Sequence, residues 1–211
     1  TRLTYLAYND PKKNPDSRLN LFSLTPQTSF KLTQGGGTQI ERVTLYHLLM
    51  RHPRFNSEDK ILRSNLQLNV NLDNWNRLIE VDSAIEKNFY CKKYLRKNVA
   101  DDFCKSLSNK NEYKTLANEI IMNIRSGRQL DRKHIGKLRM CLARICVKRL
   151  CPDLIILDEF QRFKFLLDTN ALSEDQKRSD MQLLAKELFS LPDAKVLLLS
   201  ATPYKMYTVE N

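Results

Sequence analysis

Two unbroken aliphatic runs constrain the fold of this chain more than any other feature. Leu154–Leu157 and Val196–Leu199 are apolar at every position and do not alternate with polar residues. Runs of this kind are typical of strands buried on both faces of a parallel sheet. The segment between them has apolar residues at the spacing of a helix, namely Met181, Leu184, Ala185 and Leu188. The sequence therefore predicts a strand, a helix and a second, parallel strand, which is an α/β arrangement.

Polar residues follow each predicted strand at its carboxyl end. Asp158 and Glu159 come after the first strand, and Ser200 and Thr202 come after the second. Ligands of open α/β sheets lie beyond the carboxyl ends of the strands. Two adjacent carboxylates repel each other, and Mg²⁺ bound to nucleotide phosphates would supply a counterion. We expect Asp158 to hold the hydrated metal and Glu159 to orient and deprotonate a water molecule. An ordinary acidic turn after a strand remains the alternative.

The two strand-end motifs together resemble motifs II and III of the superfamily 2 helicases and translocases, ATPases of the DEAD/DEAH-box type. The motifs read LIILDEFQ and LLLSATPYK. The resemblance implies ATP and Mg²⁺ as ligands, Asp158 as a metal ligand through water, and Glu159 as the general base. Gln161 stands at the last position of the four-residue box, at the nucleotide site, unless it is a solvent-facing residue of a first helical turn. The hydroxyls of Ser200 and Thr202 would couple the nucleotide state to the grip on nucleic acid.

The amino-terminal part offers a further resemblance. Residues 19–24 are expected to form a short strand, and Leu21 to Pro26 are similar to motif Ib of the same family, which implies that Thr25 and Thr28 contact the nucleic-acid backbone. A simple capping turn is the alternative. Residues 35–37 are three glycines without the Gly-Lys-Ser/Thr ending of a phosphate loop, so we expect a flexible loop before a helix.

The middle of the chain is predicted to be helical. Periodic apolar residues indicate helices at 39–50, 58–66, 73–107, 112–126 and 131–150. This length exceeds what the resemblance requires between motifs Ib and II. We therefore expect a partial RecA-like lobe, a parallel α/β sheet with a large α-helical insertion. Its three segments are residues 1–57 with the motif Ib-like strand and the glycine loop, 58–150 with the insertion and a connecting helix, and 151–211 with motifs II and III.

The charge of the chain favours a polyanionic partner. Lys and Arg number 35 against 24 Asp and Glu, which gives a net charge of +11 and a pI of about 9.5. Four cations fall in one narrow stripe of a predicted helix whose opposite face is apolar: Lys133, Lys137, Arg144 and Lys148. Such a stripe is suited to nucleic-acid phosphates, and the resemblance favours DNA. A solvated helix face without a ligand is the alternative.

Cysteine usage and hydropathy indicate a protein of the cytoplasm. The five cysteines include no CxxC pair, unlike a secreted disulfide framework. Three are spaced by five residues, which rotates successive thiols by about 140° on a helix and prevents convergence on one metal: Cys141, Cys146 and Cys151. Trp75 is expected to anchor a core. No apolar run approaches the roughly 20 residues that would span a membrane, so no membrane contact is expected.

The chain has no GxxxxGK[ST] sequence anywhere in its 211 residues. The resemblance therefore implies that ATP hydrolysis needs a phosphate loop and a second RecA-like lobe from the remainder of the same polypeptide, and that this chain alone is inactive. Three functions remain open at this point. The first is part of the ATPase lobe of a superfamily 2 DNA helicase or translocase. The others are a non-catalytic nucleic-acid-binding or scaffolding module and another P-loop motor, such as a viral packaging ATPase.

Overall fold

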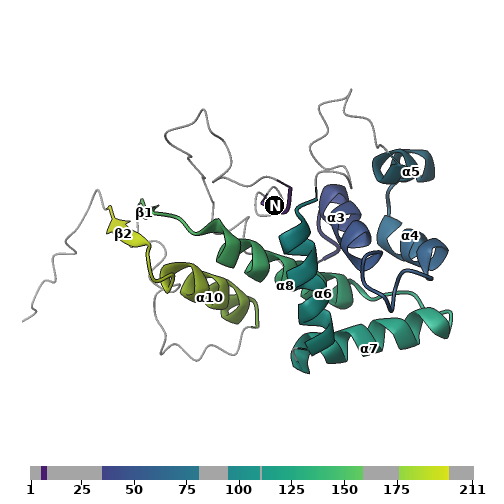
Figure 1. Ribbon diagram of the computed structural model, residues 1–211. Helices are drawn as coiled ribbons and strands as arrows, with labels where there is room; N and C mark the ends of the chain where they lie inside the picture. The colour runs from purple at the N-terminus through teal and green to yellow at the C-terminus, as the bar shows by residue number, and fades with distance from the viewer. Residues whose placement is uncertain (1–5, 9–34, 81–94, 110, 159–175, 200–211) are drawn as a thin grey trace, which may run out of the picture. The chain divides into compact units, whose positions relative to one another are not determined.

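The computed structural model describes residues 6–8, 35–80, 95–109, 111–158 and 176–199 (Figure 1). The chain divides into two compact units, residues 1–150 and 151–211. The first contains helices α3 (Gln39–Leu49), α4 (Asp59–Gln67), α5 (Leu72–Glu80), α6 (Lys97–Asn109), α7 (Asn111–Arg125) and α8 (Arg132–Leu150). The second contains strand β1 (Leu154–Leu157), helix α10 (Gln176–Phe189) and strand β2 (Lys195–Leu198). None of the described helices combines the length and the apolar character needed to cross a membrane.

Helix α3 lies at the centre of the first unit. Every residue from Glu41 to Leu49 is buried, and the helix contacts α4, α5, α6 and α8 (Figure 1). Because α3 has no solvent face, its polar side chains need partners inside the protein. Thr44 has one in Tyr8, whose hydroxyl lies 2.9 Å from the Thr44 hydroxyl. Trp75 on α5 is fully buried, which confirms its predicted role as a core anchor.

The glycine loop before α3 is held in place by Arg42. The guanidinium donates hydrogen bonds to the carbonyls of Gly37 and Leu66, both at 2.7 Å, and at longer range to those of Gly36 and Gln67. A Cβ atom on Gly37 would lie 2.4 Å from Nε of Arg139, so the loop is also closely packed. In the structure, a buried arginine holds the carbonyl groups of Gly36 and Gly37, and the predicted flexibility of the loop stays a prediction.

The start of α3 is closed by its own side chains. Thr38 and Glu41 form a capping box, with Thr38 N–H donating to Glu41 Oε2 at 2.7 Å and Glu41 N–H donating to Thr38 Oγ1 at 3.3 Å. Arg139 on α8 donates to Glu41 at 3.1 Å. Burial opposes ionisation of Glu41, but Arg139 and the Thr38 N–H lower its pKa to about 2. A carboxylate therefore occupies this helix start, where a phosphate would otherwise be favoured.

Four of the five helices predicted in the middle of the chain are confirmed within one or two residues. The prediction of one helix over 73–107 is wrong, since α5 ends at Glu80 and Leu95 and Arg96 precede α6 without helical structure. The reason is a tertiary contact: Arg96 N–H donates to Ala7 O at 2.8 Å, and the Arg96 side chain donates to Leu6 O at 3.1 Å. In a continuous helix this N–H would bond four residues back.

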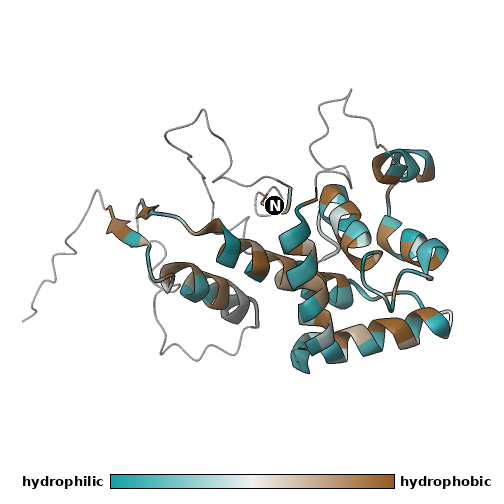
Figure 2. Ribbon diagram, in the orientation of Figure 1, coloured by the Kyte–Doolittle hydropathy of each residue, from teal (hydrophilic) through white to brown (hydrophobic). Residues whose placement is uncertain are grey.

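The second unit contains the predicted parallel strands. β1 pairs with β2 in the register Leu154 to Lys195 through Leu157 to Leu198, so the second strand begins one residue earlier than predicted. Figure 2 shows that both strands are largely hydrophobic. Burial on both faces is not confirmed for the described residues: Leu154 and Ile156 are each 51% exposed, and only Ile155 is buried.

In broad terms, the described chain is mostly helical with one small parallel sheet, which is loosely consistent with an α/β protein. Helix α3, from the first predicted segment, shares its core with helices of the second segment. The division into three segments stays a prediction. The predicted strand at 19–24 lies outside the described residues.

Candidate nucleotide and nucleic-acid site

The carboxyl edge of the β1–β2 sheet is the first candidate site. Leu157 is paired with Leu198, and Leu199 N–H donates to Leu157 O at 2.8 Å. Because the strands are parallel, the chain leaves both of them at the same edge. Asp158, the residue after β1, is exposed at this edge. The predicted convergence of the two strand ends is therefore confirmed as far as Asp158 and Leu199.

The other residues predicted for nucleotide and coupling roles lie outside the described residues: Glu159, Gln161, Ser200 and Thr202, together with Thr25 and Thr28 of the motif Ib-like stretch. Their roles stay predictions. Within the described ranges, no group of three or more His, Cys, Asp or Glu side chains is arranged to hold a metal ion. A single exposed carboxylate such as Asp158 still fits Mg²⁺, which keeps several waters and needs only one or two protein carboxylates beside nucleotide phosphates.

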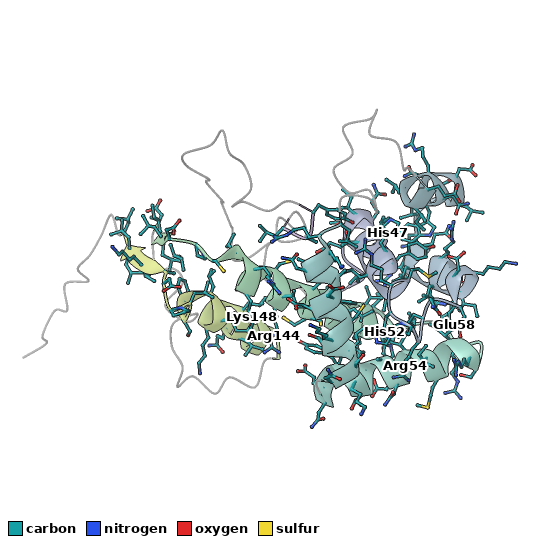
Figure 3. All side chains as sticks on the ribbon, viewed as in Figure 1. His47, His52, Arg54, Glu58, Arg144 and Lys148 are labelled. Carbon is teal, nitrogen blue, oxygen red and sulfur yellow. The ribbon has the colours of Figure 1, made fainter. Side chains whose placement is uncertain are left out.

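The basic stripe on α8 is the second candidate site, and the structure divides it. Lys133, Lys137 and Lys148 are exposed, whereas Arg144 is only partly exposed. Every residue from 138 to 143 is buried, so no solvent-facing surface joins Lys137 to Arg144 along the helix. The four cations lie on one helix at the predicted spacing, but the buried residues 138–143 separate them into two groups. Figure 3 labels Arg144 and Lys148, which lie one helical turn apart.

Arg144 is a cation fixed by its neighbours on α7. Its guanidinium donates to the Tyr113 hydroxyl at 3.1 Å, lies 6.0 Å from the centroid of that ring, and is 3.8 Å from Glu112. Burial raises the pKa of Tyr113, so the phenol remains neutral. Its counterion among these contacts is therefore the exposed carboxylate of Glu112.

The three histidines occupy structural positions. His52 is buried in the turn between α3 and α4. Its Nδ1 accepts from Arg54 N–H at 3.2 Å, so Nε2 carries the proton and donates to Ser108 Oγ at 3.0 Å. Ser108 in turn donates to Cys104 O at 3.0 Å. Because the imidazole donates to the hydroxyl, it cannot act as a base toward it.

The surroundings of His52 keep the ring neutral. Burial, and to a lesser extent the positive charge of Arg54, lower its pKa. Figure 3 labels His52 and Arg54. Sequence patterns did not reveal this contact, because His52 and Ser108 are 56 positions apart. His47 is also buried, and His134 Nε2 lies 3.7 Å from Glu119 Oε2.

The described cysteines are free thiols. Cys141 and Cys146 are buried on α8, whereas Cys151 is exposed. Burial raises the pKa of Cys146 to about 12, so this thiol stays protonated and is a poor metal ligand or nucleophile.

Comparisons of the chain with protein-family models, with curated proteins and with solved structures find no match. Motifs, local geometry and charge therefore carry the functional argument. Among these, the shared edge of β1 and β2 brings together the ends of the two strands that precede the sequence motifs.

Proposed function

We propose that this chain contributes the motif II and motif III segment of a RecA-like ATPase lobe in an ATP-dependent superfamily 2 DNA helicase or translocase. The observation that carries the proposal is the parallel pairing of Leu157 with Leu198. This register puts an Asp-Glu sequence and a Ser-Ala-Thr sequence directly after neighbouring strands. A nucleotide site requires such a convergence at the carboxyl edge of a sheet.

In this proposal each residue at the sheet edge has a separate role. Asp158 binds the hydrated Mg²⁺, and Glu159 holds the attacking water and accepts its proton. Gln161 lies at the nucleotide site, and Ser200 and Thr202 donate hydrogen bonds toward the acids. Mg²⁺, when bound, neutralises the phosphate charge.

A lysine on the β and γ phosphates is also needed, and the sequence lacks the phosphate loop that would supply it. The phosphate loop and the second lobe would come from polypeptide beyond these 211 residues. We expect no turnover by this chain alone. The sequence has five cysteines without a CxxC pair, and the four described ones are free thiols. This usage favours a reducing compartment, and we propose the cytoplasm.

Nucleic acid would be held through its phosphates. The chain carries a net charge of +11, and Lys133, Lys137 and Lys148 are exposed on α8. Arg144 adds a fixed cation near the second end of the helix. Thr25 and Thr28 would provide neutral hydroxyl donors to the backbone of the same ligand.

A non-catalytic nucleic-acid-binding or scaffolding module is the second candidate. It is favoured by the absence of a phosphate loop from the sequence and by the mostly helical character of the described residues. In that case Asp158 and Glu159 form an acidic turn without a metal. The two candidates differ in one property, which is turnover of ATP.

The test is ATP hydrolysis by the full-length protein, measured alone and with duplex DNA, single-stranded DNA or RNA. We expect DNA to stimulate turnover and Glu159→Gln to abolish it while ATP still binds. Glu80→Gln, an exposed carboxylate on α5 that pairs with Arg63, is the matched control and should turn over like the parent. Unchanged turnover in Glu159→Gln would overturn the catalytic assignment, and no turnover in the parent would favour the binding module.

A further inference from the structure

The turn between α7 and α8 gathers more positive charge than the stripe predicted on α8. Residues 125–137 read RSGRQLDRKHIGK and contain five Lys or Arg residues and one acid. All five cations are exposed: Arg125, Arg128, Arg132, Lys133 and Lys137. Three of them, Arg125, Arg128 and Arg132, do not belong to that stripe. The exposed charge of Lys133 and Lys137 thus continues around the turn.

The backbone that carries these cations is fixed by hydrogen bonds. Helix α7 ends at Arg125, and two residues later Gly127 has φ of 69°, a conformation that favours glycine. Gly127 N–H donates to Ile124 O at 3.1 Å and Arg128 N–H donates to Asn123 O at 2.8 Å, the two bonds of a Schellman motif. Two residues later, the chain is tied to α4.

That tie is a buried contact at Leu130. Its N–H donates to Oδ1 of Asn65 on α4 at 2.5 Å, and its side chain is 6% exposed. The cations on either side therefore extend from a rigid turn. Rigid presentation lowers the entropy that is lost when charged side chains bind a ligand.

The nearby acids are already engaged. Asp131 caps the start of α8, since its Oδ1 accepts from Lys133 N–H at 3.2 Å. Glu58 lies 3.4 Å from Nε of Arg125. Within the described part of the chain, the side chains of Arg128 and Arg132 take part in no hydrogen bond or ion pair. The turn keeps a strong positive field.

We propose that the α7–α8 turn docks the phosphate backbone of duplex DNA, with Arg128 and Arg132 as its principal contacts. This inference rests on the proposed function, because it assigns that function's nucleic-acid contact to a surface. Guanidinium groups bind phosphate oxygens in a bidentate manner. Residues 125–137 include no Phe, Tyr or Trp, and the ring of His134 is only 17% exposed and lies beside Glu119. These residues therefore offer no exposed aromatic platform on which an unpaired base would stack.

The chemistry of the turn also selects between nucleic-acid forms. A surface that reads charge alone favours the ligand with the higher charge density, and duplex DNA carries one charge per roughly 1.7 Å of its axis. We therefore expect duplex DNA to bind this surface more tightly than single-stranded DNA of the same length. Contacts to phosphates carry no base information, so the sequence of the duplex should have little effect.

The experiment measures binding of the full-length protein to fluorescent duplex and single-stranded DNA over a range of salt concentrations. The test variant is Arg128→Gln with Arg132→Gln. The matched control is Lys105→Gln with Lys114→Gln, which removes the same charge from exposed positions on α6 and α7. All three proteins should have the same thermal midpoint by circular dichroism, since the four side chains are exposed.

For the test variant we expect the slope of log K against log salt to become shallower by about 2, about one for each lost phosphate contact. Its affinity for duplex DNA should fall at least tenfold, whereas the control should bind like the parent. Equal losses in the two variants, or tighter binding of single-stranded DNA by the parent, would overturn the inference. If the parent binds no nucleic acid, the nucleic-acid part of the proposed function fails too. If it binds with the test variant unaffected, only the turn is wrong.

Discussion

The two units of this protein treat their apolar and polar groups in different ways. In the first, α3 is buried over nine consecutive residues, and its charged side chains are met by Arg139, Thr38 and backbone carbonyls. In the second, most residues of two aliphatic strands remain more than two-fifths exposed. Asp158 is also exposed at the edge of this sheet, so the proposed nucleotide site lies in the unit whose described strands are the more exposed.

The largest expected effect on the free energy of unfolding comes from Arg42 in the first unit. Arg42→Ala removes the donors of four backbone carbonyls and leaves a cavity in a buried position. Unsatisfied buried groups cost about 1–3 kcal/mol each, so we expect a loss of at least about 3 kcal/mol in the free energy of unfolding. Arg77→Ala, an exposed arginine on α5, is the control and should cost less than about 0.5 kcal/mol. Denaturant unfolding of both variants measures the difference, and equal losses would show that the stability of α3 does not depend on the hydrogen bonds of Arg42.

A smaller effect is expected from alanine substitutions in the glycine loop, which distinguish the contribution of close packing from that of backbone conformation. Gly35 and Gly37 both have positive φ, 75° and 70°, but a Cβ on Gly35 meets nothing within 4 Å, whereas one on Gly37 meets Arg139. Both alanine variants place a Cβ at a positive φ, where its clash with the backbone costs about 1 kcal/mol. Gly37→Ala should cost at least about 1 kcal/mol more, because the ion pair of Arg139 must move. Thermal unfolding compares the pair, and similar midpoints would mean that the loop is not tightly packed.

The pH dependence of the first unit should reflect His52. Its folded-state pKa is lowered, so below the unfolded value of about 6.5 the unfolded chain takes up a proton first. Stability should be unaffected above that pH and should fall as the pH decreases from about 6.5 toward 5, by at most about 1.4 kcal/mol per unit. His52→Gln should remove this part of the slope. Urea unfolding at several pH values measures it, and an unchanged slope in the variant would assign the effect to another group.

The smallest effect is expected in the second unit. Ile156 is 51% exposed and its neighbour Ile155 is 9% exposed. Ile156→Thr should change the free energy of unfolding by less than about 0.5 kcal/mol, as at an ordinary surface position, whereas Ile155→Thr should cost more than about 1 kcal/mol. Calorimetry of the full-length protein gives both values. A large loss in Ile156→Thr would show that this face of β1 is covered in the whole protein.

Local sequence patterns predicted most of the helices and strands, but fewer of the tertiary contacts and buried faces of those elements. Apolar spacing predicted four middle helices and both strands, because the pattern lies within each segment. It failed at Arg96, where the backbone bonds to Ala7, a residue distant in sequence. It did not show that the α8 stripe is divided, because helical spacing places cations on one face without showing that other elements bury residues 138–143.

For the candidate sites, the shared edge beside Asp158 followed from strand pairing and was predicted. The α7–α8 turn was not, because its cations come from two helices and the connection between them. Its only local signal was the density of Arg and Lys from 125 to 137.

The most direct test of the nucleotide site compares two neighbouring acids in the full-length protein. Binding of ATP and its hydrolysis are measured as functions of Mg²⁺ concentration for Asp158→Asn and Glu159→Gln. Because Asp158→Asn changes a metal ligand, binding and hydrolysis in this variant should require a higher Mg²⁺ concentration. Glu159→Gln should bind MgATP like the parent and turn over at least a hundredfold more slowly, in line with the loss of a general base. If both variants bind Mg²⁺ and ATP and turn over as the parent does, the edge of the β1–β2 sheet is not a nucleotide site.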